Sequence, residues 1–428
     1  MTTRSNLFNC GRTIFLGLIG WSLALYSSAE TTVSVGTVSA EIRQTQPGEC
    51  SSLISVHCGA APSGAFDVDG RYWVVFVQQE YLYLSYSDNQ GVEFSTPVKV
   101  NTTPEPIYTD GENRPKLAIG TEHEIYVSWT KRSPERFSGD IRFSRSIDQG
   151  KSFSPAQTIN DDGLVTSHRF DALVTDHRGD IYLAWLDKRD RQAALAQNNT
   201  YTGAALYYAV STDKGASFSP NQKVADHSCE CCRIAISRPE HSGAAIFWRH
   251  IFATNTRDHA FVIVGPKGVT QPPQRATVDN WQIDACPHHG PAMTDVDNGH
   301  YATAWFTNSP QRKGIYFGSY DAETGIMTHQ TSLSHSPGAS HPQLLRPHRG
   351  LLLAAWKVFD GQKTLIMLTA SEDNGINWQP PQVVAETEEA SDHPLLVQKG
   401  SQAYLSWLTK NEGFRLIPLF IQQEGLKG

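Results

Sequence analysis

The sequence predicts an all-β protein, a β-propeller of four-stranded blades, from three observations. A strand that ends in an aromatic residue recurs seven times, with gaps of 51 to 63 residues, at Phe76, Trp129, Trp185, Trp248, Trp305, Trp356 and Trp407. A short turn motif recurs between these marks, and the segments around it alternate apolar and polar residues with period two. Seven copies of one unit at near-constant spacing are typical of a propeller.

The N-terminal 29 residues are predicted to be a secretory signal peptide rather than part of the fold. Arg4 and Arg12 precede a short apolar run, residues 14–26, and Ser27-Ser28-Ala29 fits a small-residue cleavage site. The apolar run is too short to span a bilayer, and no second candidate span follows. We therefore expect an exported, periplasmic or extracellular protein whose residues 30–428 form a single, monomeric propeller domain.

Each unit is expected to contribute four short strands. In the second unit these are residues 115–119, 124–129, 141–144 and 153–159. The last unit, residues 394–422, has only three strands, so its fourth strand is predicted just after the signal peptide, at residues 32–42. This pairing would join the two ends of the chain and leave no open sheet edge. Seven blades are favoured, with six as the alternative.

The turn motif has a local physical cause and also carries a resemblance. Four copies, Ser85–Phe94, Ser144–Phe153, Ala209–Phe218 and Thr369–Trp378, share the pattern Ser-x-Asp-x-Gly-x-x-aromatic, and Gly318–Gly325 is a degenerate copy. In such a turn Asp accepts backbone N–H groups, Gly takes a positive φ and the aromatic ring packs on the hairpin. The motif resembles the Asp-boxes, or bacterial-neuraminidase repeats, of the sialidase superfamily. That resemblance implies turns between the third and fourth strands of propeller blades, and we assign these Asp residues no catalytic role.

Composition and charge narrow the possible partners. The 428 residues carry a formal net charge of -7 and contain no run of Lys or Arg, which argues against nucleic acid and against an anionic membrane surface. A small molecule, a glycan or a metal ion remains as the expected partner.

Aligning the units on their aromatic marks indicates where such a partner would bind. Near the start of each innermost strand stand Arg114, Arg169, Arg233, His289, His341 and His393. The innermost strands of a propeller all begin on one face, around the axis. The sequence therefore predicts a functional axial pocket, with Arg114, Arg169, Arg233, His341 and His393 as candidate substrate-binding residues.

The first hypothesis for this pocket is a metal site. Thiolate and imidazole groups gather at the two ends of the fourth unit, which suits copper(I) or zinc. The candidate ligands are His227, Cys229, Cys231, Cys232, Cys286, His288 and His289. Because exported proteins form disulfides, the alternative is a pair of structural disulfides, with Cys286 bonded to one cluster cysteine and Cys50 bonded to Cys58.

The second hypothesis is a glycoside hydrolase, on the strength of the same resemblance. Sialidases grip a substrate carboxylate with three arginines, and the resemblance implies that role for Arg114, Arg169 and Arg233. Asp110, Glu112 and Asp171 lie close enough in sequence to supply an acid or a base. The chain departs from the family because its first inner strand, residues 62–68, has no arginine, and no nucleophilic tyrosine can be assigned. A non-catalytic binding scaffold is the third hypothesis.

Overall fold

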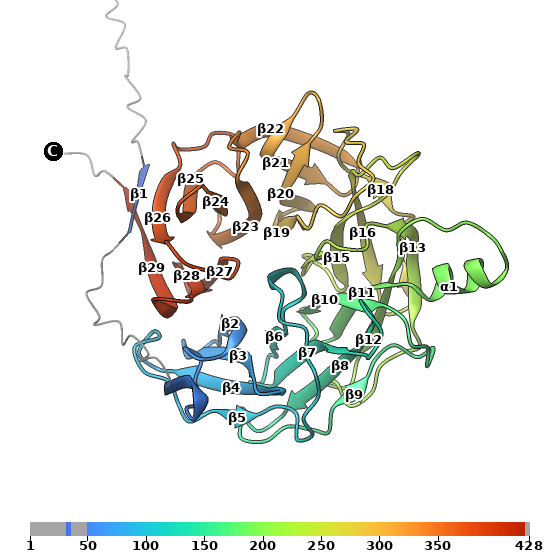
Figure 1. The fold of residues 1–428 in the computed structure, drawn as a ribbon. Helices are drawn as coiled ribbons and strands as arrows, with labels where there is room; N and C mark the ends of the chain where they lie inside the picture. Colours follow the sequence, from blue (N-terminus) through green and yellow to red (C-terminus); the bar gives the residue numbers. More distant parts are fainter. Residues whose placement is uncertain (1–30, 36–48, 424–428) are drawn as a thin grey trace, which may run out of the picture.

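The protein is a seven-bladed β-propeller, as predicted. The computed structural model describes residues 31–35 and 49–423, so the predicted signal peptide lies outside the described residues. Seven antiparallel sheets surround a common axis, and the chain follows them in order around the ring (Figure 1). Within the described residues, no helix is both long enough and apolar enough to cross a bilayer.

Each blade is a sheet in which the innermost strand lies at the axis and the following strands lie progressively farther from it. Blades one to three contain β2–β5 (Ala60–Phe66, Tyr72–Gln78, Tyr81–Ser87, Val98–Lys99), β6–β9 (Lys116–Ile119, Ile125–Arg132, Gly139–Ser146, Gln157–Thr158) and β10–β13 (His168–Thr175, Ile181–Asp187, Ala204–Ser211, Gln222–Ser228). Blade four contains β14–β18 (Ala235–Ser237, Ala244–Arg249, His259–Gly265, Gly268–Val269, Gln274–Arg275), and its last two strands both pair with β16. Blades five and six contain β19–β22 (Ala292–Asp297, His300–Asn308, Lys313–Asp321, Ile326–Ser334) and β23–β26 (Ala339–His348, Leu351–Phe359, Thr364–Ser371, Gln382–Thr387).

Blade seven closes the ring by pairing the two ends of the chain. It contains β27 (Leu395–Lys399), β28 (Gln402–Thr409), β29 (Gly413–Gln423) and, outermost, β1 (Thr31–Val35). β1 runs antiparallel to β29, with Val33 opposite Ile421. The predicted closure is therefore confirmed, while the part of the predicted strand beyond Val35 lies outside the described residues.

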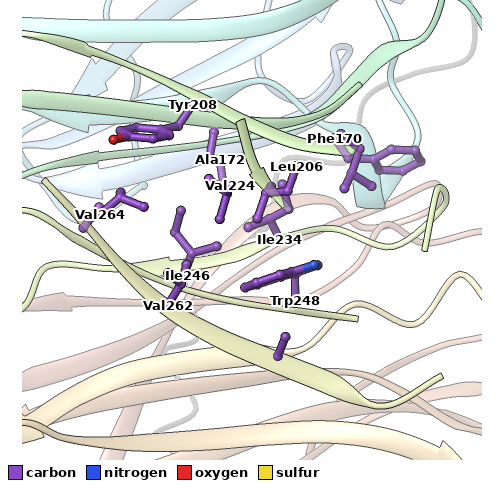
Figure 2. Packing of buried hydrophobic residues seen from close by; sticks show 14 of the residues in the cluster. Phe170, Ala172, Leu206, Tyr208, Val224, Ile234, Ile246, Trp248, Val262 and Val264 are labelled. Carbon is purple, nitrogen blue, oxygen red and sulfur yellow. The ribbon is translucent and has the colours of Figure 1, made fainter. Parts of the chain in front are cut away.

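The core lies between neighbouring blades. The six tryptophans that mark the second strands, Trp129, Trp185, Trp248, Trp305, Trp356 and Trp407, are all less than 2% exposed. Figure 2 shows the packing between blades three and four, where Leu206 of β12 lies in the same cluster as Ile246 of β15. Burial of one such side chain contributes about 1.5–3 kcal/mol, so the ring of interfaces accounts for much of the stability.

The turn motif forms the hydrogen bonds that the sequence predicts. In blade two, Asp148 Oδ1 accepts from Ser152 N at 3.0 Å, Ser146 Oγ accepts from Gly150 N at 2.8 Å, and Gly150 has a φ of 77°. Blade one corrects the expectation of an invariant aspartate, because Asn89 occupies that position and accepts from Glu93 N at 2.9 Å. An amide oxygen can accept the same backbone N–H bond, so the turn survives the exchange.

One α-helix, α1 (Arg189–Ala196), was not expected from the sequence. It lies in the connection from β11 to β12 and buries none of its residues, so it has no apolar stripe by which sequence analysis could find it. Two single-turn 3-10 helices, η1 (Glu49–Ser51) and η2 (Gly111–Asn113), also occur. η2 is the more important because it lies at the axis.

The antiparallel order of the strands gives the propeller two different faces. The innermost strands all begin on one face, which we call the mouth face. The turns between third and fourth strands, including the Asp-boxes, lie on the opposite face, which we call the Asp-box face.

Candidate functional site

An axial cavity of about 270 Å³ lies among the innermost strands. Residues from all seven innermost strands line it, among them Ser63, Lys116, Leu173, Ile236, Met293, Leu344 and Leu395. Its charged and imidazole side chains are those of Glu112, Arg114, Lys116, Arg233 and His393. The walls are mostly aliphatic and the charged groups are few, which is typical of a small-molecule pocket.

Glu112, on η2, is the hub of the mouth. Its side chain is 3% exposed, and Arg233 Nη1 donates to its Oε1 at 2.6 Å. Its Oε2 accepts from the backbone N–H groups of Arg233 at 2.8 Å and of Gly290 at 2.9 Å. The carboxylate therefore joins the entry loops of blades two, four and five.

Three histidines surround this hub. The ring centroids of His341 and His393 lie 3.5 Å apart, and the ring centroids of His289 and His341 lie 5.4 Å apart. His341 Nε2 is 3.6 Å and His393 Nδ1 is 3.9 Å from Glu112 Oε1. Glu112, His341 and His393 can thus bring ligand atoms within 4.8 Å of one another.

Burial keeps all three imidazoles neutral. Burial first, together with nearby positive charges that include Arg249, lowers the pKa of His289 to about 3. The pKa values of His341 and His393 are lowered in the same direction, by burial first and by the positive charge of Arg233 among other charges. The Nδ1 atoms of all three rings are buried and have no hydrogen-bond partner among the described residues. The mouth thus offers neutral nitrogen atoms that a bound ligand could satisfy.

Two glycines and one bulge allow this close packing. A Cβ on Gly111 would lie 2.5 Å from His393 Nδ1, and one on Gly290 would lie 2.2 Å from Arg233 Cγ. His341 has a φ of 54° within a register shift between Ser340 and Gln343. A bulge of this kind turns a side chain out of its strand, and histidine tolerates the left-handed conformation better than most residues.

The three predicted arginines have different environments. Arg233 binds Glu112, while Arg114 donates to Asp392 Oδ1 at 2.7 Å and to three backbone carbonyls. Arg169 lies 3.7 Å from Asp110 and over the ring of Tyr108 at 4.2 Å, and it does not line the cavity. Each arginine is therefore already engaged, and they do not form a free three-arginine clamp around the axis.

The predicted acids are also dispersed. Asp110 caps η2 by accepting from Asn113 N at 3.0 Å, and its side chain is 48% exposed. Asp171 is fully buried and accepts from Ser128 Oγ at 2.6 Å, so no ligand reaches it. Of the acids considered from the sequence, only Glu112 lines the axial cavity.

The candidate metal ligands are split between three places. Cys229, Cys231 and Cys232 are buried in the core between blades three and four and do not line the axial cavity, which corrects their predicted position. The chain crosses there from the outermost strand of blade three to the innermost strand of blade four, so only the end of the crossover, at Arg233, reaches the axis. Of the seven predicted ligands, His289 is the one whose ring contacts the mouth histidines.

The remaining predicted ligands are near the surface. His227 is exposed and has its Nδ1 3.1 Å from Thr202 O, and His288 is exposed too. Cys286 is exposed and unpaired, so the predicted disulfide from it to the cluster is not formed. The other predicted disulfide, Cys50–Cys58, is present.

The thiols of the cluster influence one another. Hydrogen bonds from the other two thiols lower the pKa of Cys229, and the positive charges of Arg249 and Arg257 lower it further. The pKa of Cys231 is raised by its thiol neighbours, and that of Cys232 is raised first by burial.

Sequence analysis missed Lys116, a cavity residue on β6. Its Nζ donates to the backbone carbonyl of Arg114, and burial lowers its pKa. Among the described residues, no carboxylate forms an ion pair with it. Its place two residues after Arg114, on an innermost strand, was the available signal, because alternate residues of a strand share one face.

Comparisons with known proteins support the fold. No protein-family model matches the chain, and a search of curated proteins finds no match. An ulvan lyase, a polysaccharide lyase solved with -[GlcA(1-4)Rha3S]- bound, superposes with a TM-score of 0.52 at 10% identity, covering 86% of this chain and 94% of that chain. A second structure of ulvan lyase gives a TM-score of 0.52 at 11% identity, covering 87% and 93%. A Hadza microbial sialidase gives a TM-score of 0.46 at 16% identity, covering 82% and 76%. The likeness to the lyase, at this identity, shows a common fold.

Proposed function

We propose that the protein binds the acidic sugar at the reducing end of a glycan in the axial mouth and cleaves the bond that links the rest of the glycan to it. One observation carries this proposal: the Lys116 amine, which forms no ion pair with a carboxylate in the described residues, lines the axial cavity together with the neutral imidazole of His393. A buried unpaired cation favours an anionic ligand, because a negative charge placed beside it replaces the water that it has lost. The carboxylate of an acidic sugar would supply that charge.

The size of the cavity favours one sugar unit. Its volume of about 270 Å³ lies just below the range for small-molecule sites, roughly 300–1,000 Å³. Glu112, Arg233 and His393 are among the residues that line it. The terminal unit would enter the cavity, and the rest of the glycan would lie over the mouth face.

The groups at the mouth favour β-elimination as the reaction. A neutral imidazole, His393, takes the proton from the carbon next to the sugar carboxylate, while the positive charge of Lys116 stabilises the charge that develops there. The electron pair left by that proton forms a carbon–carbon double bond, and the bond to the glycosidic oxygen breaks. That oxygen then takes a proton from water that enters over the mouth face, and the hydroxide that remains takes the proton from His393. The products are an unsaturated acidic sugar and a shortened glycan.

Hydrolysis of the sialidase kind is the second candidate. It requires a pair of carboxyl groups, or a tyrosine with an acidic partner, around the scissile bond. Both oxygens of Glu112 are already engaged, Asp171 is sealed in the core, and no tyrosine lines the cavity. The same engagement of Glu112 argues against a metal ion held by Glu112, His341 and His393.

The likeness to ulvan lyase supports an acidic glycan. The sugar in that complex contains GlcA, a uronate, whose carboxylate is the group that Lys116 would bind. The shared fold is compatible with such a ligand, and the residues of this mouth supply the reason for choosing elimination.

A glycan of the GlcA(1-4)Rha3S repeat and a fluorogenic sialoside test the proposal together. We expect the first to yield products with the ultraviolet absorbance of an unsaturated uronate and without an added water by mass spectrometry. His393→Asn should lower the rate by about 10²–10⁴-fold, the usual contribution of a general base. His341→Asn should be slower as well, because its ring stacks on His393.

His329→Asn is the matched control. His329 is exposed on β22 and has a φ of 48°, close to the 54° of His341, so the same substitution is made in the same backbone conformation away from the mouth. It should leave the rate unchanged. Products that carry an added water would favour hydrolysis, and no cleavage or binding of either glycan would contradict the proposal.

A further inference from the structure

The cysteine cluster of the crossover between blades three and four has the shape of a metal site. The three sulfur atoms form a nearly equilateral triangle, 3.7 Å from Cys229 to Cys231, 3.8 Å from Cys229 to Cys232 and 4.0 Å from Cys231 to Cys232. All three residues are at most 4% exposed. The chain thus turns three neighbouring thiols toward one point in a dry interior.

The size of this triangle matches a metal–thiolate bond. Its centre lies about 2.2 Å from each sulfur, close to the bond length of about 2.3 Å between a metal ion and a thiolate. Within the described residues, no fourth His, Cys, Asp or Glu ligand atom joins this group. Zinc takes four ligands in structural sites, whereas soft sulfur ligands select copper(I).

We propose that Cys229, Cys231 and Cys232 form a trigonal all-thiolate site for one copper(I) ion. This site is separate from the axial mouth and does not depend on the function proposed for it. Binding replaces the thiol protons with the metal, and the protons pass to solvent. No change in the oxidation state of the protein or of the ion is needed.

Two buried arginines supply the charge that such a site requires. Three thiolates around copper(I) carry a net charge of -2, which is costly in the core unless positive charge lies close. Arg249 is 1% exposed and Arg257 is 8% exposed, and their guanidinium groups donate to backbone carbonyls. Neither forms an ion pair with a carboxylate in the described residues.

These arginines are next to the cluster. Cys229 N donates to Arg249 O at 2.9 Å, and Arg257 lines one surface cavity together with Glu230, which stands between Cys229 and Cys231 in the chain. Without a metal–thiolate anion, two cations would remain buried and uncompensated. The arginines therefore provide an observation, independent of the sulfur triangle, that indicates an anionic cluster.

The alternatives fit this structure less well. A disulfide uses two thiols and leaves the third buried without a partner, while Cys286 is exposed and outside the group. The other buried candidate, Asp162, His168 and Asp187, has no free ring nitrogen, because His168 Nδ1 lies 2.8 Å from Gly139 O and Nε2 lies 3.0 Å from Asp162 Oδ2.

A surface cavity of about 380 Å³ lies near the crossover. It is lined by Glu230, which stands between Cys229 and Cys231 in the chain, and by Arg257 and Cys286. The three cluster cysteines do not line this cavity, and Glu230 pairs with Lys188 and Arg191.

Copper(I) itself is the probe for the test. The full chain is reduced, loaded with a copper(I) salt under nitrogen, desalted, and analysed for metal content and by X-ray absorption at the copper edge. We expect one copper per chain, three sulfur neighbours at about 2.2–2.3 Å and no nitrogen neighbour. Cys231→Ser and Cys232→Ser should lose stoichiometric binding, whereas the matched control Cys286→Ser should keep it.

If a cluster variant fails to fold, the X-ray absorption spectrum of the copper-loaded wild-type protein still tests the proposal. Nitrogen or oxygen neighbours in that spectrum, or loss of copper in Cys286→Ser, would overturn the proposal. So would a preference for zinc when both ions are offered at equal concentration, or a disulfide among the three cysteines in the loaded protein.

Discussion

The two faces of the propeller differ in how completely their polar groups are bonded. On the Asp-box face, the same set of hydrogen bonds recurs in blades one, two, three and six, with the Gly N–H to Ser Oγ distance at 2.8 Å each time. On the mouth face the residue type changes around the ring, from arginine in blades two to four to histidine in blades five to seven, and the buried Nδ1 atoms of His289, His341 and His393 have no partner among the described residues. On the Asp-box face Asn374 Oδ1 is a buried atom without a partner as well. Repeated bonding is thus typical of the scaffold, and several unmet bonds gathered in one place are typical of the site.

This difference gives a way to distinguish structural from functional polar residues in a repeat protein. A polar group that is satisfied within its own turn, such as Asp148, stabilises that turn and nothing further away. A buried group that joins several blades, such as Glu112, determines how the loops meet at the axis. The predictions that follow test whether the two faces respond differently to mutation and to pH.

The largest expected effect comes from the hub of the mouth. Glu112→Ala should destabilise the protein by about 3–5 kcal/mol, because it leaves the buried Arg233 guanidinium and the Gly290 N–H without their acceptor. The free energy of unfolding in urea measures this cost. The double variant Glu112→Met/Arg233→Met should recover much of the loss, since replacing both partners removes the uncompensated charge. A cost below about 1 kcal/mol for Glu112→Ala would show that the pair behaves like a surface ion pair instead.

The pH dependence of stability should separate the faces next. The folded pKa of His289 is about 3, below the usual value of about 6.5, so the unfolded chain binds a proton between these values and the folded chain does not. Stability should therefore fall as the pH drops from about 6.5 to about 3, by up to about 1.4 kcal/mol per pH unit for each such group.

The Asp-box face should respond only at lower pH. Hydrogen bonds from Ser152 lower the pKa of Asp148 to about 2, so its contribution is present above about 3.9 and is lost as the pH falls through about 2. Thermal unfolding of His289→Asn and Asp148→Asn from pH 7 to pH 4 distinguishes the two. The slope of stability against pH should flatten in His289→Asn and stay unchanged in Asp148→Asn. An unchanged slope in His289→Asn would mean that its ring is protonated in the folded protein.

The fold could be predicted from the sequence because its signals are local and repeated. Each aromatic mark and each Asp-box turn reports on one blade, and the seven aromatic marks, Phe76 and six tryptophans, fix the architecture. The order of residues at the mouth could also be read, since His289, His341 and His393 occupy equivalent places in their units. The sequence does not show which residues of a connection between two blades reach the axis and which pack between the blades. Cys229 to Cys232 and Arg233 are adjacent in sequence, yet the cysteines pack between blades and the arginine reaches the cavity. Lys116 was missed for a related reason, because only the packing of all seven inner strands shows which of their residues line the cavity.

The smallest expected effect concerns the one turn in which asparagine replaces aspartate. Asn89→Asp gives blade one the usual motif, and its carboxylate should bind Glu93 N and the Ser87 hydroxyl more strongly than the amide oxygen does. The same change places a negative charge beside Asp88 and Glu93 and removes the bond from Asn89 Nδ2 to Glu93 Oε2 at 3.3 Å. The stronger hydrogen bonds are opposed by the added charge repulsion and the lost bond, and the site is exposed. The change in the free energy of unfolding should therefore stay within about 0.5 kcal/mol. Asp373→Asn is the matched reverse exchange in blade six, where no acid occupies the position equivalent to Glu93 because Asn377 stands there. It should therefore cost more than Asn89→Asp gains, and equal and opposite values in urea unfolding would show that the acidic neighbours of blade one have no influence on its turn.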